Sequence, residues 1–334
     1  MTKTGLYFFL IACLALALAS GARANTLKIA TLAPAGTSWM QAMQAGADEI
    51  RQRTGGRLDL KFYPGGVMGN DQSVHRKIRI GQLQGGAFSA SGLAVANSGI
   101  QVLGLPMLFK NLDEVDYVRE RVDPIIKQHT KDSGFVILGI TEGGFARILS
   151  RQPMQDLESL RRGKVWIPEG DRVSQVTFKA LGITPVSLPI ADVFTGLQTG
   201  LIDTVAVNPT SAIAFQWHTS TAYMTDLPIT YVVGVLAVSE QAFEELGSED
   251  QAILVEVMGE VFARMNITNR AEDQAAMEAL RNQGITFVPA GQGEAERWRK
   301  IADRAIDEMV SSGIIDAGIV DRVRGYLKAF RDRK

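Results

Sequence analysis

Cysteine is almost absent from this chain of 334 residues, and the single one, Cys13, lies in the N-terminal segment. Without that segment the chain has no thiol, which excludes disulfides, thiol catalysis and thiolate metal sites. The three histidines, His75, His129 and His218, are far apart in sequence and lack the spacing of metal ligands. No Gly-x-Ser-x-Gly elbow or phosphate-binding loop is present. We therefore predict no cofactor, no metal and no enzyme activity.

An excess of one charge sign is also missing. The chain has 35 Lys+Arg and 36 Asp+Glu, and removal of Lys3 and Arg23 would leave 33 against 36. This balance offers no basic surface for nucleic acid, so we predict no nucleic-acid partner. After the N-terminal segment no apolar run is long enough to cross a bilayer.

Residues 1–24 have the pattern of an export signal. Lys3 is followed by an apolar run from Leu6 to Ala19, and Ala22-Arg23-Ala24 forms a small-residue cleavage site. We expect the mature protein to begin at Asn25 in the periplasm. An alternative is lipoprotein processing at Cys13, which ranks second because it would leave the run 14–19 on the mature end.

Alternating strand patterns and helical patterns predict an α/β fold with an open sheet. Residues 183–203 form a short strand, a turn, a small helix and the start of another strand, and ligands of such sheets lie at the carboxyl ends of the strands. A helix from about 248 to 283 would be about 50 Å long at ~1.5 Å per residue, more than one domain needs.

Two domains of ordinary size account for this length. We assign residues 25–142 plus about 231–265 to domain I, and 143–230 plus about 266–334 to domain II. The chain would cross between them in two strands, near 141–144 and 231–234, where glycines make bending easy. The long helix would span both domains.

Several short motifs, in this order, resemble those of the DctP-type solute-binding receptors of tripartite ATP-independent periplasmic (TRAP) transporters. The motifs are Ile29-Ala30-Thr31-Leu32-Ala33-Pro34-Ala35-Gly36-Thr37 with Trp39, Thr54-Gly55-Gly56-Arg57, Tyr63-Pro64-Gly65-Gly66 with Gly69, and Asp192-Val193-Phe194 with Leu197-Gln198-Thr199-Gly200 and Asp203. The resemblance covers nearly all of the mature chain. It implies a two-domain periplasmic binding protein fold with β-strand hinges, a ligand cleft that closes, and delivery to TRAP membrane subunits.

The resemblance also implies an arginine that grips a ligand carboxylate with two parallel hydrogen bonds, within Gly-x-Lys-x-Arg-hydrophobic-Pro. Here the matching stretch is Gly163-Lys164-Val165-Trp166-Ile167-Pro168, so the arginine position is Trp166, and a second family arginine falls at about Phe145. An indole offers an apolar face and can hold a cation, but cannot fork onto a carboxylate. We therefore expect a more apolar or larger ligand than a C4-dicarboxylate. The alternative is that Trp166 is simply core.

The alternative ligand is an organic acid, held by a compensating arginine. Arg147, Arg151 and Arg172 are the candidates, although surface solvation is the usual fate of arginine. Glu169 and Asp171, close to Arg172, would suit hydroxyl or amino groups on a ligand.

Further candidate ligand contacts come from both expected domains. The resemblance places Asn208 of Asn208-Pro209 against the ligand and Ile190 where the family often has Phe, while Phe215 and Trp217 either wall the cleft or pack in the core. From domain I we expect Thr31, Trp39, Ser89 and Ser91, for which capping, core packing and turns are the alternatives.

Two other functions stay open from sequence. One is a carrier of hydrophobic ligands, or a sensor, without a transporter. The other is a periplasmic enzyme, which would need an acid and a base across the cleft, with His218 and Glu169 or Asp171 the best pair available.

Overall fold

The computed structural model describes residues 24–333. Lys3, Cys13 and the remainder of the expected export signal up to Arg23 lie outside the described residues. No helix within residues 24–333 is both long and apolar enough to span a membrane.

Ten strands make up the sheets of the described chain. They are β1 (Asn25–Thr31), β2 (Leu58–Tyr63), β3 (Gly85–Ser89), β4 (Phe135–Ser150), β5 (Trp166–Pro168), β6 (Val186–Leu188), β7 (Thr204–Val207), β8 (Tyr223–Thr225), β9 (Thr230–Ser239) and β10 (Thr286–Val288).

Helices cover these strands. They are α2 (Ser38–Arg53), α3 (Asp71–Arg79), α4 (Ala90–Leu93), α5 (Leu112–Asp132), α6 (Leu157–Arg162), α7 (Arg172–Ala180), α8 (Val193–Thr199), α9 (Pro209–Ala214), α10 (Glu240–Glu244), α11 (Ser248–Asn282), α12 (Glu294–Ser311) and α13 (Ala317–Arg331), with short 3₁₀ turns η1 (Ser98–Gly104), η2 (Ile190–Asp192) and η3 (Trp217–Ser220).

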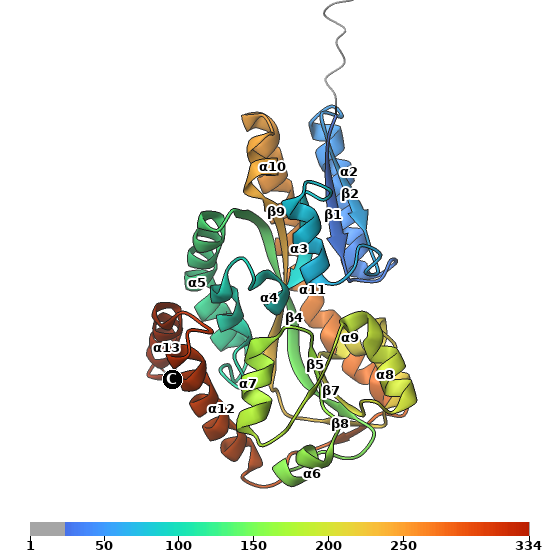
Figure 1. Cartoon of the computed structure of the whole chain (residues 1–334), viewed down its shortest axis with the longest axis vertical. Coiled ribbons are helices and arrows are strands. Elements are labelled where there is room, and N and C mark those ends of the chain that lie inside the picture. Colours follow the sequence, from blue (N-terminus) through green and yellow to red (C-terminus); the bar gives the residue numbers. More distant parts are fainter. Residues whose placement is uncertain (1–23, 334) are drawn as a thin grey trace, which may run out of the picture.

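One continuous sheet runs in the order β10-β8-β4-β9-β3-β1-β2, and β7 pairs with β4. The β1 strand is parallel to β2 and β3, whereas β9 is antiparallel to β3 and β4. In Figure 1, β4 and β9 run from the upper part of the molecule, which holds β1, β2 and α3, into the lower part, which holds β7 and β8. Their pairing shifts register between Glu142 and Phe145, so the pairing is irregular where the chain passes between the two parts.

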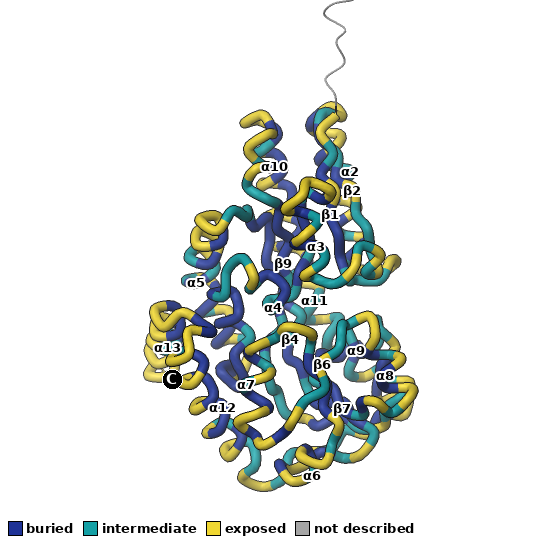
Figure 2. The backbone as a smooth tube through the Cα atoms, viewed as in Figure 1, coloured by how far each residue is buried: buried dark blue, intermediate teal, exposed yellow. Residues whose placement is uncertain are grey.

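Helix α11 is 35 residues long and joins two hydrophobic cores. Its first half packs with Met43 and Ile50 of α2, and its second half brings Leu280 into the core around Val205. The buried backbone along the central strands in Figure 2 runs through both parts. The expected long bridging helix is thereby confirmed.

The C-terminal helices differ from the expected domain division. Helix α12 places Trp298 and Ile301 in the core of the lower part but Ile306 and Met309 in the core that contains α5. Helix α13 then packs on α5 and η1. Its apolar stripe is covered by the first expected domain, although our division assigned residues 266–334 to the second.

Two elements have different lengths from those that local patterns predict. The continuous apolar run 135–140 predicts a buried strand that ends before Gly143-Gly144, but β4 continues to Ser150 because its bulge absorbs these glycines without ending the pairing. Pro209, which suits the first turn of a helix, predicts a helix over 209–218. Helix α9 instead ends at Ala214, because Gln216 adopts a left-handed conformation with φ 59°.

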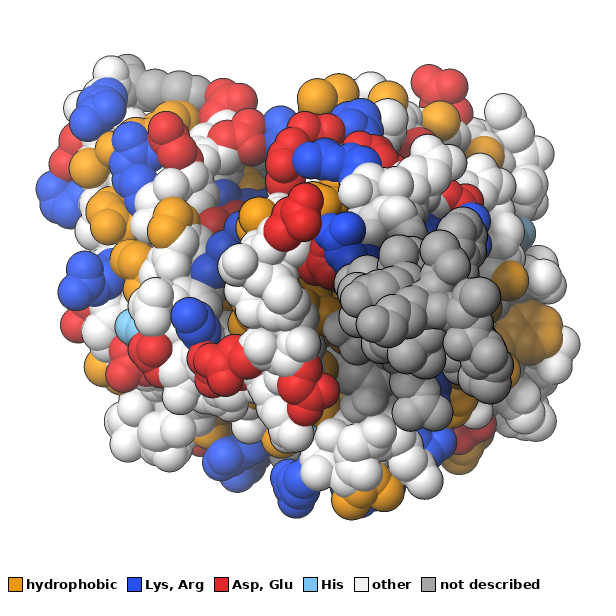
Figure 3. All heavy atoms as spheres, turned by 90° about the horizontal axis from the view of Figure 1, so that it is seen from above, with side chains coloured by type: hydrophobic (Ala, Val, Ile, Leu, Met, Phe, Trp, Pro, Cys, Tyr) orange, Lys and Arg blue, Asp and Glu red, His pale blue; other side chains and the backbone are white. Residues whose placement is uncertain are grey.

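Charged side chains of both signs are interspersed on the face seen in Figure 3, which shows no broad field of one sign. The groups of His, Asp and Glu among the described residues include none that could hold a metal ion.

Candidate ligand-binding cleft

Two adjoining cavities form a cleft between the upper and lower parts of the molecule. The first, which we call the Trp39 cavity, has a volume of about 260 Å³, and the second, the Trp166 cavity, about 220 Å³. They share the residues Ser89, Ile190, Asn208, Ser211, Phe215, Val232 and Val233. The shared wall makes the two cavities one binding space.

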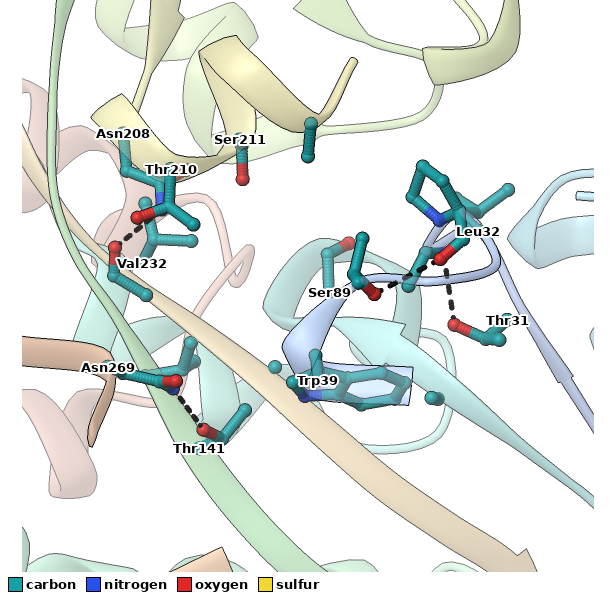
Figure 4. A pocket seen from close by; sticks show the side chains of 18 of the residues that line it. Thr31, Leu32, Trp39, Ser89, Thr141, Asn208, Thr210, Ser211, Val232 and Asn269 are labelled. Carbon is teal, nitrogen blue, oxygen red and sulfur yellow. Dashed lines mark hydrogen bonds between the residues drawn. The ribbon is translucent and has the colours of Figure 1, made fainter. Parts of the chain in front are cut away.

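The Trp39 cavity is built where strands end and helices begin. Strand β1 ends at Thr31, and Thr37 caps α2 by accepting a hydrogen bond from the Met40 N–H (3.3 Å), which sets Trp39 in the first turn. Figure 4 shows Thr31, Leu32 and Ser89 on one side of this cavity and Asn208, Thr210 and Ser211 opposite them. The cavity therefore draws its walls from both parts of the molecule.

Two amide side chains anchor the irregular segment of β4 beside this cavity. Asn208 Nδ2 donates to the carbonyl of Gly143 (2.6 Å), and Asn269 Nδ2 donates to Thr141 Oγ1 (2.9 Å) and to the Glu142 carbonyl (2.6 Å). Asn208 is 5% exposed. These contacts tie α9 and α11 to the strand that joins the two parts.

Aromatic rings dominate the Trp166 cavity. Trp166 Nε1 donates to the Leu188 carbonyl (3.0 Å), and its ring meets Trp217 edge to face with 5.2 Å between centroids. Trp217 in turn stacks on Phe215 at 5.3 Å. Trp166 is thus both a core residue and a cavity wall, so both interpretations from the sequence apply.

No Lys, Arg or His side chain is among the described residues that line either cavity, but three carboxylates are: Glu142, Glu272 and Asp171. Glu142 is buried and accepts hydrogen bonds from the Tyr231 hydroxyl (2.8 Å) and from Arg270 Nη2 (3.0 Å). Burial raises the pKa of the Tyr231 hydroxyl, so it stays protonated as a donor. Arg270 also pairs with Asp116. The charge of Glu142 is therefore compensated.

Asp171 and Glu272 have hydroxyl and amide partners. The Asp171 carboxylate accepts from the Ser174 N–H (3.2 Å) and Oγ (2.7 Å), and burial raises its pKa. Glu272 accepts from Ser38 Oγ (2.8 Å). The described lining of the cleft thus contains acidic side chains and no basic ones.

Ten of the fourteen residues expected from sequence lie at the cleft. Thr31 and Trp39 line the first cavity only, Ser91, Trp166, Asp171 and Trp217 line the second only, and Ser89, Ile190, Asn208 and Phe215 line both. Their role in ligand binding stays a prediction.

The other four expected residues line neither cavity. Phe145 packs edge to face on Tyr231 at 5.6 Å. Arg147 donates to the Phe145 carbonyl (3.3 Å) and to Asp226 (3.4 Å), away from the cleft. Glu169 is exposed and accepts from Asn70 Nδ2 (2.6 Å), and Arg172 is exposed.

Two further residues named from the sequence are also outside both linings. Arg151 donates to the Ser220 carbonyl (3.2 Å), and His218 Nδ1 contacts the Ala212 carbonyl (3.0 Å). Neither a compensating arginine nor the suggested His218 base therefore faces the cleft.

Sequence reasoning missed several lining residues. Thr210 and Ser211 directly follow Asn208-Pro209, so their position along the chain could have indicated them. Asn269 and Glu272 lie in the middle of α11, and a helical pattern gives no sign that this turn passes a cavity.

Residues 29–312 match the DctP family, described as "Bacterial extracellular solute-binding protein, family 7". The chain belongs to this family. The resemblance seen in the short motifs is thereby confirmed. DctP is a family of solute-binding proteins that act outside the cytoplasm, and it is not a family of enzymes.

Individual relatives are distant in sequence but close in fold. The uncharacterized protein YiiZ of Salmonella typhimurium is 26% identical over 211 residues, which is 62% of this chain and 64% of YiiZ. The C4-dicarboxylate-binding periplasmic protein DctP of Rhodobacter capsulatus is 21% identical over 266 residues, 78% of this chain and 80% of that protein.

The sugar acid binding protein DctPAm of Advenella mimigardefordensis, solved in complex with galactonate, superposes with a TM-score of 0.85 at 18% identity. The match covers 92% of this DctP-family chain and 99% of that chain. The α/β fold of a two-domain periplasmic binding protein is thereby confirmed, with the long helix α11 bridging the two parts.

Proposed function

We propose that this DctP-family protein is the periplasmic receptor of a TRAP transporter. It captures a small solute in the cleft and delivers it to the transporter's membrane subunits. The family match and the cleft walled from both parts of the molecule support this function. Residues 1–24 would act as the export signal, with cleavage before Asn25.

The proposed mechanism is closure of two domains on the solute. Contacts from both sides of the cleft favour the closed form when the solute is present. The proposed domains are 25–142 with about 231–265, and 143–230 with about 266–334, except that the packing of α13 on α5 favours grouping the last helix with the first domain. Bending would occur in β4 and β9 near 141–144 and 231–234.

The observation that carries the ligand proposal is the absence of any cationic side chain from the described lining of the cleft. Trp166 lines the second cavity at the position where the family resemblance implies a carboxylate-binding arginine, and Arg147 is held by Asp226 and the Phe145 carbonyl. A ligand carboxylate that entered this cleft would lose its hydration shell without gaining the two parallel hydrogen bonds that an arginine provides. The solute is therefore one that does not rely on a carboxylate anchor.

Titration calorimetry of the mature protein with succinate and malate tests this proposal. We expect no tight binding of either. The Trp166→Phe variant keeps an aromatic ring in the core, and it should weaken binding of the natural solute about threefold to tenfold by reducing the ring surface. Submicromolar binding of succinate, unchanged in Trp166→Phe, would contradict the ligand proposal.

The receptor function itself is tested separately. Mass spectrometry of solute released from freshly purified protein identifies the ligand, and small-angle scattering with that solute measures closure. We expect a more compact particle when the solute is added. A purified protein that carries no solute and shows no compaction with any periplasmic extract fraction would count against a receptor.

A further inference from the structure

The Trp166 cavity contains one carboxylate without a cationic partner. Asp171 makes its hydrogen bonds to the backbone N–H and hydroxyl of Ser174, and no Lys, Arg or His nitrogen of residues 24–333 lies within ion-pair distance of it. Among residues 24–333, the one hydrogen-bond donor to Glu272, which lines the neighbouring cavity, is the hydroxyl of Ser38. The cleft therefore contains two carboxyl groups whose charge, when they are ionised, is not neutralised by any cationic side chain of residues 24–333.

The same cavity is walled by aromatic rings. Trp166 and Trp217 are 5% and 3% exposed, and Phe215 stacks on Trp217 and lines both cavities. Because the Trp166 N–H already donates to the Leu188 carbonyl, this group is not free to donate to a guest, and Trp166 contributes an aromatic wall to the cavity. Aromatic surfaces next to a carboxylate are the surroundings that attract an ammonium group.

An ionised carboxylate without a cationic partner repels an anionic guest in the same cavity. Salt screens this repulsion less in a confined cavity than on an open surface. A cationic guest gains from the carboxylate and from the ring quadrupoles together. We infer that the natural solute carries an ammonium or comparable small cationic group, which binds in the Trp166 cavity beside Asp171. This inference rests on the proposed receptor function.

The capping role of Asp171 does not account for its charge. Asp171 is the N-cap of α7, and its side chain accepts from the Ser174 N–H. Asn, Ser and Thr cap helices about as well as Asp without a negative charge. The cap therefore explains a small polar residue at this position, and an amide there would remove the charge while keeping the helix start.

Two sets of isosteric probes separate charge from shape. Putrescine, butane-1,4-diol and succinate share a four-carbon chain and differ in charge. Choline, 3,3-dimethylbutan-1-ol and 3,3-dimethylbutanoate share a branched head. Binding of each to the mature protein is measured by calorimetry, and the solute released from freshly purified protein is identified by mass spectrometry. We expect the cationic member of at least one set to bind at least tenfold more tightly than its neutral and anionic partners.

Substitution of Asp171 tests the assignment to this carboxylate. We expect Asp171→Asn to weaken binding of the cationic probe, or of the released solute, at least tenfold. The matched control is Asp156→Asn, because Asp156 caps α6 through the Ser159 N–H in the same way and lines neither cavity. The control should bind like the unmodified protein. Thermal melting should show that Asp171→Asn is no less stable, since burial of the charge is unfavourable in the folded state.

The outcomes distinguish the two proposals. Preference for a neutral or anionic probe, or a released solute without a cationic group, overturns this inference while leaving the receptor function intact. Equal loss of affinity in Asp171→Asn and Asp156→Asn, or none in either, overturns the assignment to Asp171. If none of the probes binds, the charge of the released solute decides. A protein that releases no solute and closes on none fails the receptor proposal as well.

Discussion

Among single residues, Asp273 on α11 has one of the two buried side-chain atoms that lack a hydrogen-bond partner within residues 24–333, its Oδ1. A Cβ atom at Gly144 would come within 3.0 Å of its carboxyl carbon. Burial raises the pKa of this carboxyl from 3.8 to about 6, although the charge of Arg147 and hydrogen bonds from Thr210 oppose the shift. A folded-state pKa above the unfolded value means that ionisation of Asp273 destabilises the fold.

The first prediction follows from that sign. The stabilisation from the protonated carboxyl is fully present below pH 3.8 and is lost as the pH rises through about 6. Asp273→Asn should therefore raise the free energy of unfolding at pH 7.5 by about 2 kcal/mol, and by much less at pH 4.5. Urea denaturation at both pH values measures the difference. If Asp273→Asn has the same free energy of unfolding as the unmodified protein at pH 7.5, the Asp273 carboxylate is better solvated than its burial indicates.

At this scale the sequence predicted residue types better than directions. Trp166, Asn208 and Phe215 reach the cleft from the start of β5 and from the two ends of α9, and a motif and its spacing can indicate such positions. Arg147 follows Phe145 by two positions on β4, but the ion pair with Asp226 turns it away. That partner is 79 residues distant, so no local pattern could have shown the contact.

Among the elements, β4 and α11 are packed too closely for a side chain at one position. A Cβ atom on Gly139 would lie 2.2–2.6 Å from atoms of the Phe262 ring, which belongs to the core beneath α11. A buried ring of this size cannot move aside without displacing its neighbours.

Gly139→Ala should therefore lower the free energy of unfolding by about 2 kcal/mol through overpacking. The control is Gly259→Ala. Gly259 lies on α11, as Phe262 does, but no atom lies within 4 Å of the position that its Cβ would take. That control should be stabilising by about 1 kcal/mol, since alanine favours helix more than glycine does. Chemical denaturation measures both, and a neutral Gly139→Ala would mean that Phe262 can rotate freely.

The ends of elements were predictable where the chain carries an explicit signal. Helix α11 was expected over 248–283 and spans Ser248–Asn282, because acidic residues begin it and Gly284, with φ 93°, follows it. The early end of α9 carries no such signal, because a glutamine and not a glycine takes the left-handed position. Strand β4 extends beyond its expected end because pairing with β7 and β8, which is set by the tertiary fold, continues it to Ser150.

At the scale of the whole molecule, a hydrogen bond outside the two cavities joins the two sides of the cleft. Asn70 Nδ2, at the start of α3, donates to Glu169 (2.6 Å), which follows β5. Neither residue lines the Trp39 cavity or the Trp166 cavity. The contact can form only when the two sides are close, so it should favour the closed form.

Asn70→Asp tests that role without touching the solute. Aspartate caps α3 as well as asparagine does, so the stability should be unchanged, while two carboxylates would face each other across the cleft. We expect about tenfold weaker binding of the natural solute and a larger radius in small-angle scattering. Adding Glu169→Gln should restore both. If the double variant binds as weakly as Asn70→Asp alone, the loss does not come from repulsion between these two groups.

The overall two-part α/β architecture was the easiest part to predict, because it depends on the order of strands and helices along the chain. The spacing of apolar residues indicates that order. The grouping of the C-terminal helices was not predictable, because α12 and α13 are both ordinary amphipathic helices by sequence. Their apolar stripes indicate that they are covered, but not by which core.

The placement of α12 constrains how far this protein can open. Its first turns are rooted in one hydrophobic core through Trp298 and its later turns in the other through Met309. A helix whose two ends are buried in different cores limits the separation of those cores. The two parts can rotate about α12, but they cannot separate unless Trp298 leaves its core. The two domains of the empty receptor should therefore rotate relative to each other only up to a maximum angle. The packing of α12, at a distance from the solute, would set that angle.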